Sequence, residues 1–77
     1  MWLISLEGEH VFQGRSVLGY IKTISELDRV REYLNNTYEV EFATDKDVVQ
    51  RYDTYYSYPI INSDKDITLV VELIREL

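Results

Sequence analysis

The sequence predicts one layered α/β domain, with helices packed on a mixed sheet in the order β-β-α-β-α-β-α. Two observations predict it. Short apolar runs typical of strands are separated by longer runs in which apolar residues recur at helical spacing. In addition, residues 23–26, 44–47 and 63–66 are rich in hydroxyl and acidic side chains, which suit the first turns of helices.

The first two strands are predicted from apolar patterns on either side of a turn. Polar and apolar residues alternate through residues 2–7, which is typical of a strand. Gly14 marks a turn after an ambiguous stretch. Residues 17–21 are apolar on both faces, so they favour a strand in the interior of the sheet.

The first helix is predicted by its start, its face and its end. Thr23-Ile24-Ser25-Glu26 is a capping box, whose hydroxyl and carboxylate satisfy two backbone amides at a helix start. Apolar side chains then recur on one helical face, namely Ile24, Leu27, Val30 and Leu34. Asn35-Asn36 suits a left-handed residue that ends the helix.

The remaining elements alternate between strand and helix, and the last one is contested. Residues 38–42 alternate strictly and predict a half-buried strand, whereas residues 44–52 predict a short helix. Residues 58–61 predict a short strand in which Pro59 requires an edge position or a special turn. Residues 66–77 alternate well enough for a strand, but their apolar side chains also occupy one arc of a helix, which we favour.

Length and cysteine content bound the domain. With 77 residues, the chain is expected to be a single domain over residues 1–77, or a fragment of a larger protein, near the lower limit for a self-sufficient core. It contains no cysteine, so no disulfide, thiolate nucleophile or sulfur-ligated metal is available. We therefore expect added stability from a neighbour, either adjoining sequence or a second copy in a homodimer.

The charge of the chain disfavours two classes of partner. A net charge of −6 and the lack of a Lys/Arg run predict no binding to nucleic acid. No apolar stretch approaches the length of a membrane span, so no membrane partner is expected either. If Met1 is the natural start, the sequence predicts a cytoplasmic protein; an excised domain leaves the compartment open, including the ER lumen.

Residues 17–61 contain four short motifs in a characteristic order. Val17-Leu18-Gly19-Tyr20-Ile21-Lys22 is a Gly-Tyr strand, and a helix separates it from the strand at residues 40–44. Residues 47–52 place an acid before two apolar residues and a tyrosine, and Tyr58-Pro59-Ile60-Ile61 follows. This series resembles the thioredoxin-like fold, in particular the non-catalytic domains of protein disulfide isomerases and of calsequestrin. The resemblance implies a small thioredoxin-like domain, with a cis-proline at Pro59.

The resemblance does not extend to redox chemistry. Ser25-Glu26-Leu27-Asp28 stands where active members of the family carry Cys-x-x-Cys. Thiol–disulfide exchange requires a thiolate, so the chain is predicted to be redox-inactive. No other motif in the sequence supports catalysis, so no enzymatic activity and no cofactor are expected. His10, the single histidine, lies among acidic residues in a predicted turn, with no nucleophile placed beside it.

A tyrosine cluster is the predicted partner-binding site. Tyrosine combines a large apolar face with a polar tip and is enriched at protein interfaces. In thioredoxin-like domains, peptides dock beside the cis-proline, so the resemblance points to the same place. The predicted site consists of Tyr52, Tyr55, Tyr56, Tyr58 and Pro59. The alternative, with two of these tyrosines in the core and two exposed, stays open.

A second group of residues is acidic. Glu39, Glu41, Asp45 and Asp47 are predicted to form an acidic surface. The calsequestrin resemblance implies weak calcium binding there, but a solvated strand face and an acidic helix start explain these residues better. No metal site is therefore predicted.

Two functions are compatible with these features. The favoured one is a non-catalytic module of thioredoxin-like fold that binds a protein or peptide. The alternative is a small free-standing acidic regulator or inhibitor, of the type encoded by mobile elements, that binds a basic site on a host protein.

Overall fold

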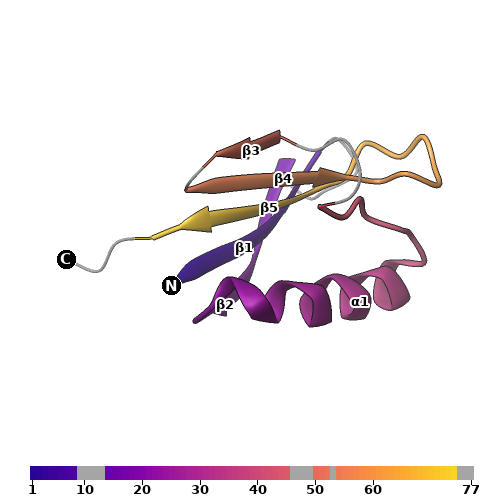
Figure 1. The fold of residues 1–77 in the computed structure, drawn as a ribbon. Helices are drawn as coiled ribbons and strands as arrows, with labels where there is room; N and C mark the ends of the chain where they lie inside the picture. The colour runs from indigo at the N-terminus through magenta and orange to yellow at the C-terminus, as the bar shows by residue number, and fades with distance from the viewer. Residues whose placement is uncertain (9–13, 46–49, 53, 75–77) are drawn as a thin grey trace.

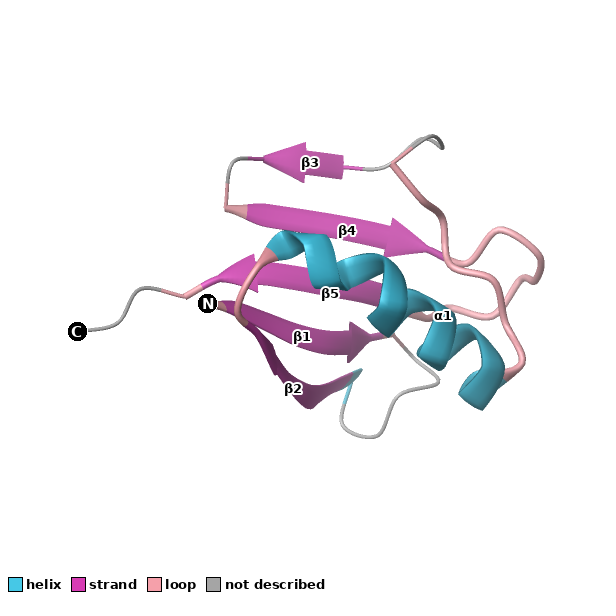
Figure 2. Ribbon diagram, turned by 60° about the horizontal axis from the view of Figure 1, so that its bottom comes forward, coloured by secondary structure: helices cyan, strands magenta, loops and turns pink. Residues whose placement is uncertain are grey.

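The chain forms one sheet with a helix across it. The computed structural model describes residues 1–8, 14–45, 50–52 and 54–74. In this part, the elements are β1 (Trp2–Glu7), β2 (Arg15–Ile21), a 3₁₀ turn (Ile24–Glu26), α1 (Leu27–Tyr38), β3 (Gln50–Tyr52), β4 (Tyr55–Pro59) and β5 (Thr68–Leu73). The sheet order is β2-β1-β5-β4-β3, with every pairing antiparallel. Figure 1 and Figure 2 show α1 lying across one face of this sheet.

The predicted thioredoxin-like arrangement is wrong. The described chain has the order β-β-α-β-β-β, with one α-helix and an antiparallel sheet, instead of a mixed sheet with three helices. The described residues also contain no cis peptide bond, so the cis-proline implied at Pro59 is not found.

The last element is the strand that the sequence left as the alternative. Thr68–Leu73 forms β5, which lies between β1 and β4 at the centre of the sheet, so the favoured helix is wrong. The physical reason is burial on both faces, because Leu69, Val70 and Val71 all have no exposed surface. A run of apolar β-branched residues fits such a position better than one side of a surface helix.

The strand at residues 17–21 is confirmed, but its predicted interior position is wrong. β2 occupies one edge of the sheet and pairs with β1. Its register shifts opposite Ile4 and Ser5, where the sheet has a bulge next to Gly19. Val17, Leu18 and Tyr20 are therefore exposed, in contrast to the buried residues of β5, and only Ile21 at the end of β2 reaches the core.

The first helix is confirmed, and it ends later than predicted. The Glu26 carboxylate accepts the backbone amides of Lys22 and Thr23 at 3.0 and 3.2 Å, as the capping box requires. The helix continues past Asn35-Asn36 to Tyr38. The capping residue that follows, Glu39, has a left-handed φ of 55°. As a result, the predicted strand at residues 38–42 is wrong, apart from one bridge between Phe42 and Ile60.

The predicted helix at residues 44–52 is also not found in the described residues. Thr44 and Asp45 form a loop and a turn, and Gln50–Tyr52 is strand β3. Residues 46–49 lie outside the described part. β3 pairs with β4 in antiparallel fashion, with Tyr52 opposite Tyr55. The predicted strand at residues 58–61 in fact begins earlier, because β4 covers Tyr55–Pro59.

The core lies between α1 and the sheet. Its fully or almost fully buried side chains come from five segments, and they include Ile4, Leu6, Leu27, Leu34, Phe42, Tyr58, Leu69 and Val71. Burying each large apolar side chain contributes about 1.5–3 kcal/mol. Phe42 reaches the core although it lies in a loop, because Asn35 accepts its backbone amide at 2.9 Å and thereby fixes the loop to α1.

The opposite face of the sheet carries an arginine that is ion-paired across the strands. In the described part of the chain, no helix covers this face. Arg15 extends from β2 across β1, so that its Nη2 donates to Glu72 at 2.8 Å and its Nε lies 3.7 Å from Glu7. Ser5 and Val70, which are paired across β1 and β5 on this face, are fully buried.

Candidate protein-binding surface

The structure separates the predicted tyrosine site between the two faces of the sheet. Tyr58 points to the helix side and is only 1% exposed, so it belongs to the core. Tyr56 lies on the same side and stacks on Trp2 at 5.4 Å between ring centroids. Tyr55 lies on the other face and is half-buried, and Pro59 is exposed at the end of the strand. The side chain of Tyr52 lies outside the described part. Strand alternation therefore prevents one continuous tyrosine patch.

Tyr55 has a distinct electrostatic environment. Burial raises the pKa of its phenol, and the nearby carboxylates of Glu7 and Glu72 raise it further. A hydrogen bond with Ser57 and the charge of Arg15 act in the opposite direction. The phenol is thus held in its neutral form beside Glu7, Glu72 and Arg15, the charged residues of this face.

The predicted acidic surface is not a single strand face. Glu39 and Glu41 are exposed in the segment after α1, where no strand forms. Asp45 accepts the Tyr58 hydroxyl at 2.8 Å, and Asp47 lies outside the described part. Among the described residues, no three side chains of the metal-ligating types gather into a group. Within the same residues, no helix has the length and apolar character needed to cross a membrane.

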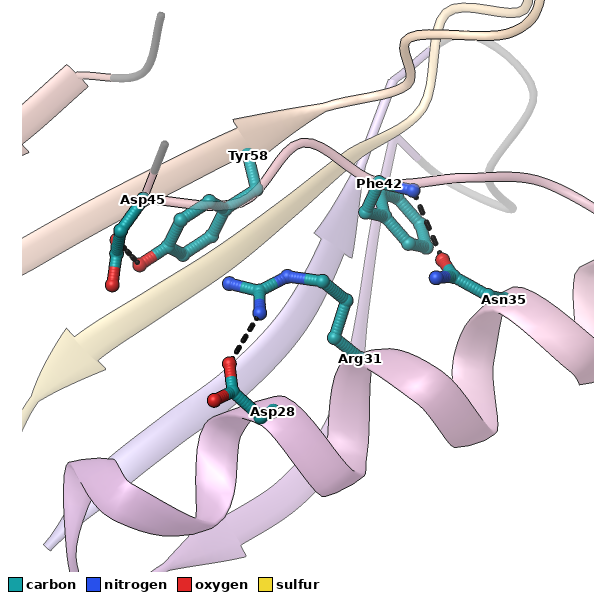
Figure 3. A network of polar contacts seen from close by, with 6 residues as sticks. All are labelled: Asp28, Arg31, Asn35, Phe42, Asp45 and Tyr58. Atoms are coloured by element: carbon teal, nitrogen blue, oxygen red, sulfur yellow. Dashed lines mark hydrogen bonds and ion pairs between the residues drawn. The ribbon is translucent and has the colours of Figure 1, made fainter. Parts of the chain in front are cut away.

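A polar network seals one flank of α1 against β4. Figure 3 shows Arg31 between Asp28 and Tyr58, with Asp45 at the tyrosine hydroxyl. The Arg31 Nη1 donates to Asp28 at 2.7 Å, and its Cζ lies 4.5 Å from the centroid of the Tyr58 ring. Such a cation–π contact contributes about 0.5–2 kcal/mol, with the larger values in buried sites.

This network bounds a cavity but does not present its cation to a ligand. The cavity has a volume of about 510 Å³ and is lined by Arg31, three acidic side chains, Asn35 and Thr44. The Nε and Nη2 of Arg31 have no hydrogen-bond partner and no accessible surface. Because these atoms are sealed, the arginine acts as a packing and pairing group of the core.

The other flank of α1 is open and forms an apolar groove against β2. This groove has a volume of about 390 Å³. Ile4, Ile21 and Leu34 contribute to its lining from the core. The other lining residues are Leu18, Gly19 and Tyr20 from β2 and Val30, Tyr33, Thr37 and Tyr38 from α1. Among the described residues that line it, none is charged, although 29% of the chain is charged. We call this groove, together with the exposed side chains of β2, the edge surface.

Exposed apolar side chains extend the edge surface around β2. Val17 lies opposite Ser5 and Tyr20 opposite Leu3, which are positions on the face of the sheet away from α1. Five large side chains of the edge surface are 40–68% exposed, namely Val17, Leu18, Tyr20, Tyr33 and Tyr38. Single exposed apolar residues are ordinary, but five around one strand and one groove form a concentration that monomeric proteins rarely expose.

Sequence reasoning missed this surface, although its signal was present. The apolar run at residues 17–21 was interpreted as an interior strand, and its position at the edge is what exposes it. Tyr33 stands outside the predicted apolar stripe of the helix, on a position expected to face solvent, whereas Tyr38 was assigned to the predicted strand at residues 38–42. An aromatic side chain at such a position was the available indication.

Comparison of the chain with known proteins gives no family: no protein-family model, no curated protein and no solved structure matches it.

Proposed function

We propose that the chain is a non-catalytic protein-binding module whose contact surface is the edge surface. The observation that carries this proposal is the uncharged groove between α1 and β2, with Leu18, Tyr33 and Tyr38 exposed along it. The centres of protein interfaces are depleted in charged residues and enriched in tyrosine, which matches this composition.

The rigid elements around the groove also support the proposal. Val30, Tyr33 and Leu34 lie on a helix whose opposite flank is fixed by Arg31 and the core. Leu18 lies at the bulge of β2, and this strand pairs with β1 on both sides of it through Val17 and Gly19. A partner therefore meets side chains that are already positioned, and binding requires little ordering of the module.

Photo-crosslinking in the cell that produces the protein tests the proposal without a known partner. A photoreactive phenylalanine analogue is placed at Tyr33 in one variant and at Leu18 in another. The matched control carries the analogue at Ile61, which is 50% exposed and is not among the lining residues of the groove. We expect one dominant protein adduct from the two groove positions and none from the control.

The pattern of adducts decides the outcome. Circular dichroism spectra of the purified variants confirm that each retains the fold. Adducts that appear equally at Ile61 and at the groove positions, or that form at neither groove position, would contradict the proposal.

A further inference from the structure

We infer that the occupant of the edge surface is a second copy of the same chain, related by a twofold axis. This inference rests on the proposed function, because it names the partner of the same surface. Its support comes from the distribution of charge, from the shape of the groove and from the exposed area.

Charge favours contact between two copies at this place. Each copy carries a net charge of −6, so two copies repel at long range. No acidic residue occurs between Glu9 and Glu26, whereas this stretch contains Arg15 and Lys22 at the two ends of β2. The described lining of the groove is uncharged. Two acidic copies that meet at the groove bring an uncharged lining into contact. On the other face of β2, the carboxylates of Glu7 and Glu72 are ion-paired with Arg15, which lowers the electrostatic cost of association.

The groove is shaped for a self-complementary contact. Tyr33 is the most exposed aromatic side chain among the described residues, at 68%, and it stands directly beside a hollow lined by Leu18 and Val30. In a twofold arrangement, each copy contributes the same patch, so a projection beside a hollow can fill the hollow of the other copy. Reciprocal insertion of Tyr33 meets this condition.

The exposed area matches a weak and specific dimer. A tyrosine presents roughly 150–250 Å² when fully exposed, so the five exposed side chains of the edge surface provide at most about 500 Å² per copy. Val17 and Tyr20 lie on the face of the sheet away from α1, so this area is reached only by a contact that covers the edge of β2 from both faces. The pair would bury roughly 1,000 Å², which is the lower limit for a specific interface. The contact is made through side chains, because the bulge at Gly19 interrupts the free edge of β2 and opposes a continuous sheet between the copies.

Sedimentation velocity over a range of protein and salt concentrations tests the inference. Between about 0.01 M and about 1 M salt, the Debye length falls from roughly 30 Å to 3 Å. Because two acidic copies repel, salt strengthens the dimer, and we expect its apparent Kd to fall on the order of tenfold. A basic partner protein would show the opposite dependence. Leu18→Glu and Tyr33→Glu should each weaken the dimer at least tenfold, whereas Ile61→Glu adds the same charge elsewhere and should change it less than twofold.

The outcomes separate this inference from the proposed function. A dimer that is strengthened by salt and is lost in Leu18→Glu and Tyr33→Glu supports both. A chain that stays monomeric in all conditions, while Tyr33 and Leu18 crosslink to a different protein, overturns the second copy and leaves the proposed function standing. A dimer that survives both substitutions uses another surface and overturns the inference. If Tyr33 and Leu18 also give no crosslinked adduct, the proposed function fails together with the inference.

Discussion

The two flanks of α1 use similar residue types for different purposes. On the flank toward β4, Arg31 packs under Tyr58, and Phe42 is fully buried. On the flank toward β2, Tyr33 and Tyr38 lie along an open groove. Aromatic side chains are thus buried on the side of the helix toward β4, which we call the sealed flank. They are exposed on the side toward β2, which we call the open flank.

This difference shows that composition does not determine what an aromatic side chain does. The sealed flank has a second layer of chain over it, because the segment after α1 returns through Phe42 to the end of β4. The open flank faces β2, beyond which the sheet has no further strand in the described part. We therefore expect substitutions on the sealed flank to change stability, and those on the open flank to change association.

The largest difference is expected between two aromatic residues four positions apart. Phe42→Ala removes a fully buried ring and should lower the free energy of unfolding by about 3–5 kcal/mol. Tyr38→Ala, on the open flank, should lower it by less than about 1 kcal/mol. Denaturant unfolding followed by circular dichroism measures both, and equal losses would show that the two flanks are not distinct.

A buried arginine provides the next comparison. Arg31→Ala removes the packed side-chain stem and the cation–π contact, so it should cost about 2 kcal/mol. Arg31→Met keeps an apolar chain of similar length and removes two nitrogens, Nε and Nη2, that have no hydrogen-bond partner, so it should cost less than about 1 kcal/mol. Its partner Asp28 is 91% exposed and stays solvated after either change.

The same unfolding experiment checks the role of charge on this flank. Asp28→Asn should change stability by less than about 1 kcal/mol, since an exposed partner contributes little. If Arg31→Met is as damaging as Arg31→Ala, the charge of the arginine, and not its packing, stabilises the sealed flank.

The sequence predicted local elements of this molecule better than their arrangement. The capping box at Thr23-Ile24-Ser25-Glu26 and the apolar face after it located α1, because these signals arise within a few residues. The strand at residues 2–7 was predicted for the same reason. The end of the helix was misplaced, since Asn35 uses its side chain to hold Phe42 and leaves the left-handed position to Glu39.

The misassigned elements depend on long-range pairing. Residues 68–73 fit both periodicities, and the choice was decided by β1 and β4, which lie on either side of β5. The apolar run at residues 17–21 looks the same whether or not a further strand covers it. The candidate surface could not be located for this reason, because it exists only where β2 is the last strand of the sheet.

A smaller effect is expected from one hydroxyl group on the sealed flank. Tyr58→Phe removes the hydroxyl that donates to Asp45 at 2.8 Å, and should lower the free energy of unfolding by about 1 kcal/mol. The ring stays in place over Arg31, so the cation–π contact is retained. Asp45→Asn keeps an oxygen acceptor at the same position and should cost less. A loss of more than about 2 kcal/mol for Asp45→Asn would indicate that Asp45 stabilises the fold chiefly by its charge.

The smallest effect on stability is expected on the open flank, where the effect on association is largest. Tyr33→Ser removes an exposed ring, so the free energy of unfolding should change by less than about 0.5 kcal/mol. Because tyrosines in interfaces often contribute a large share of the binding energy, the same change should weaken association at least about tenfold. Unfolding and sedimentation measurements on one preparation of the variant compare the two quantities directly. A variant that unfolds easily but still associates would reverse the assignment of the two flanks, since its ring would then support the core and not the contact.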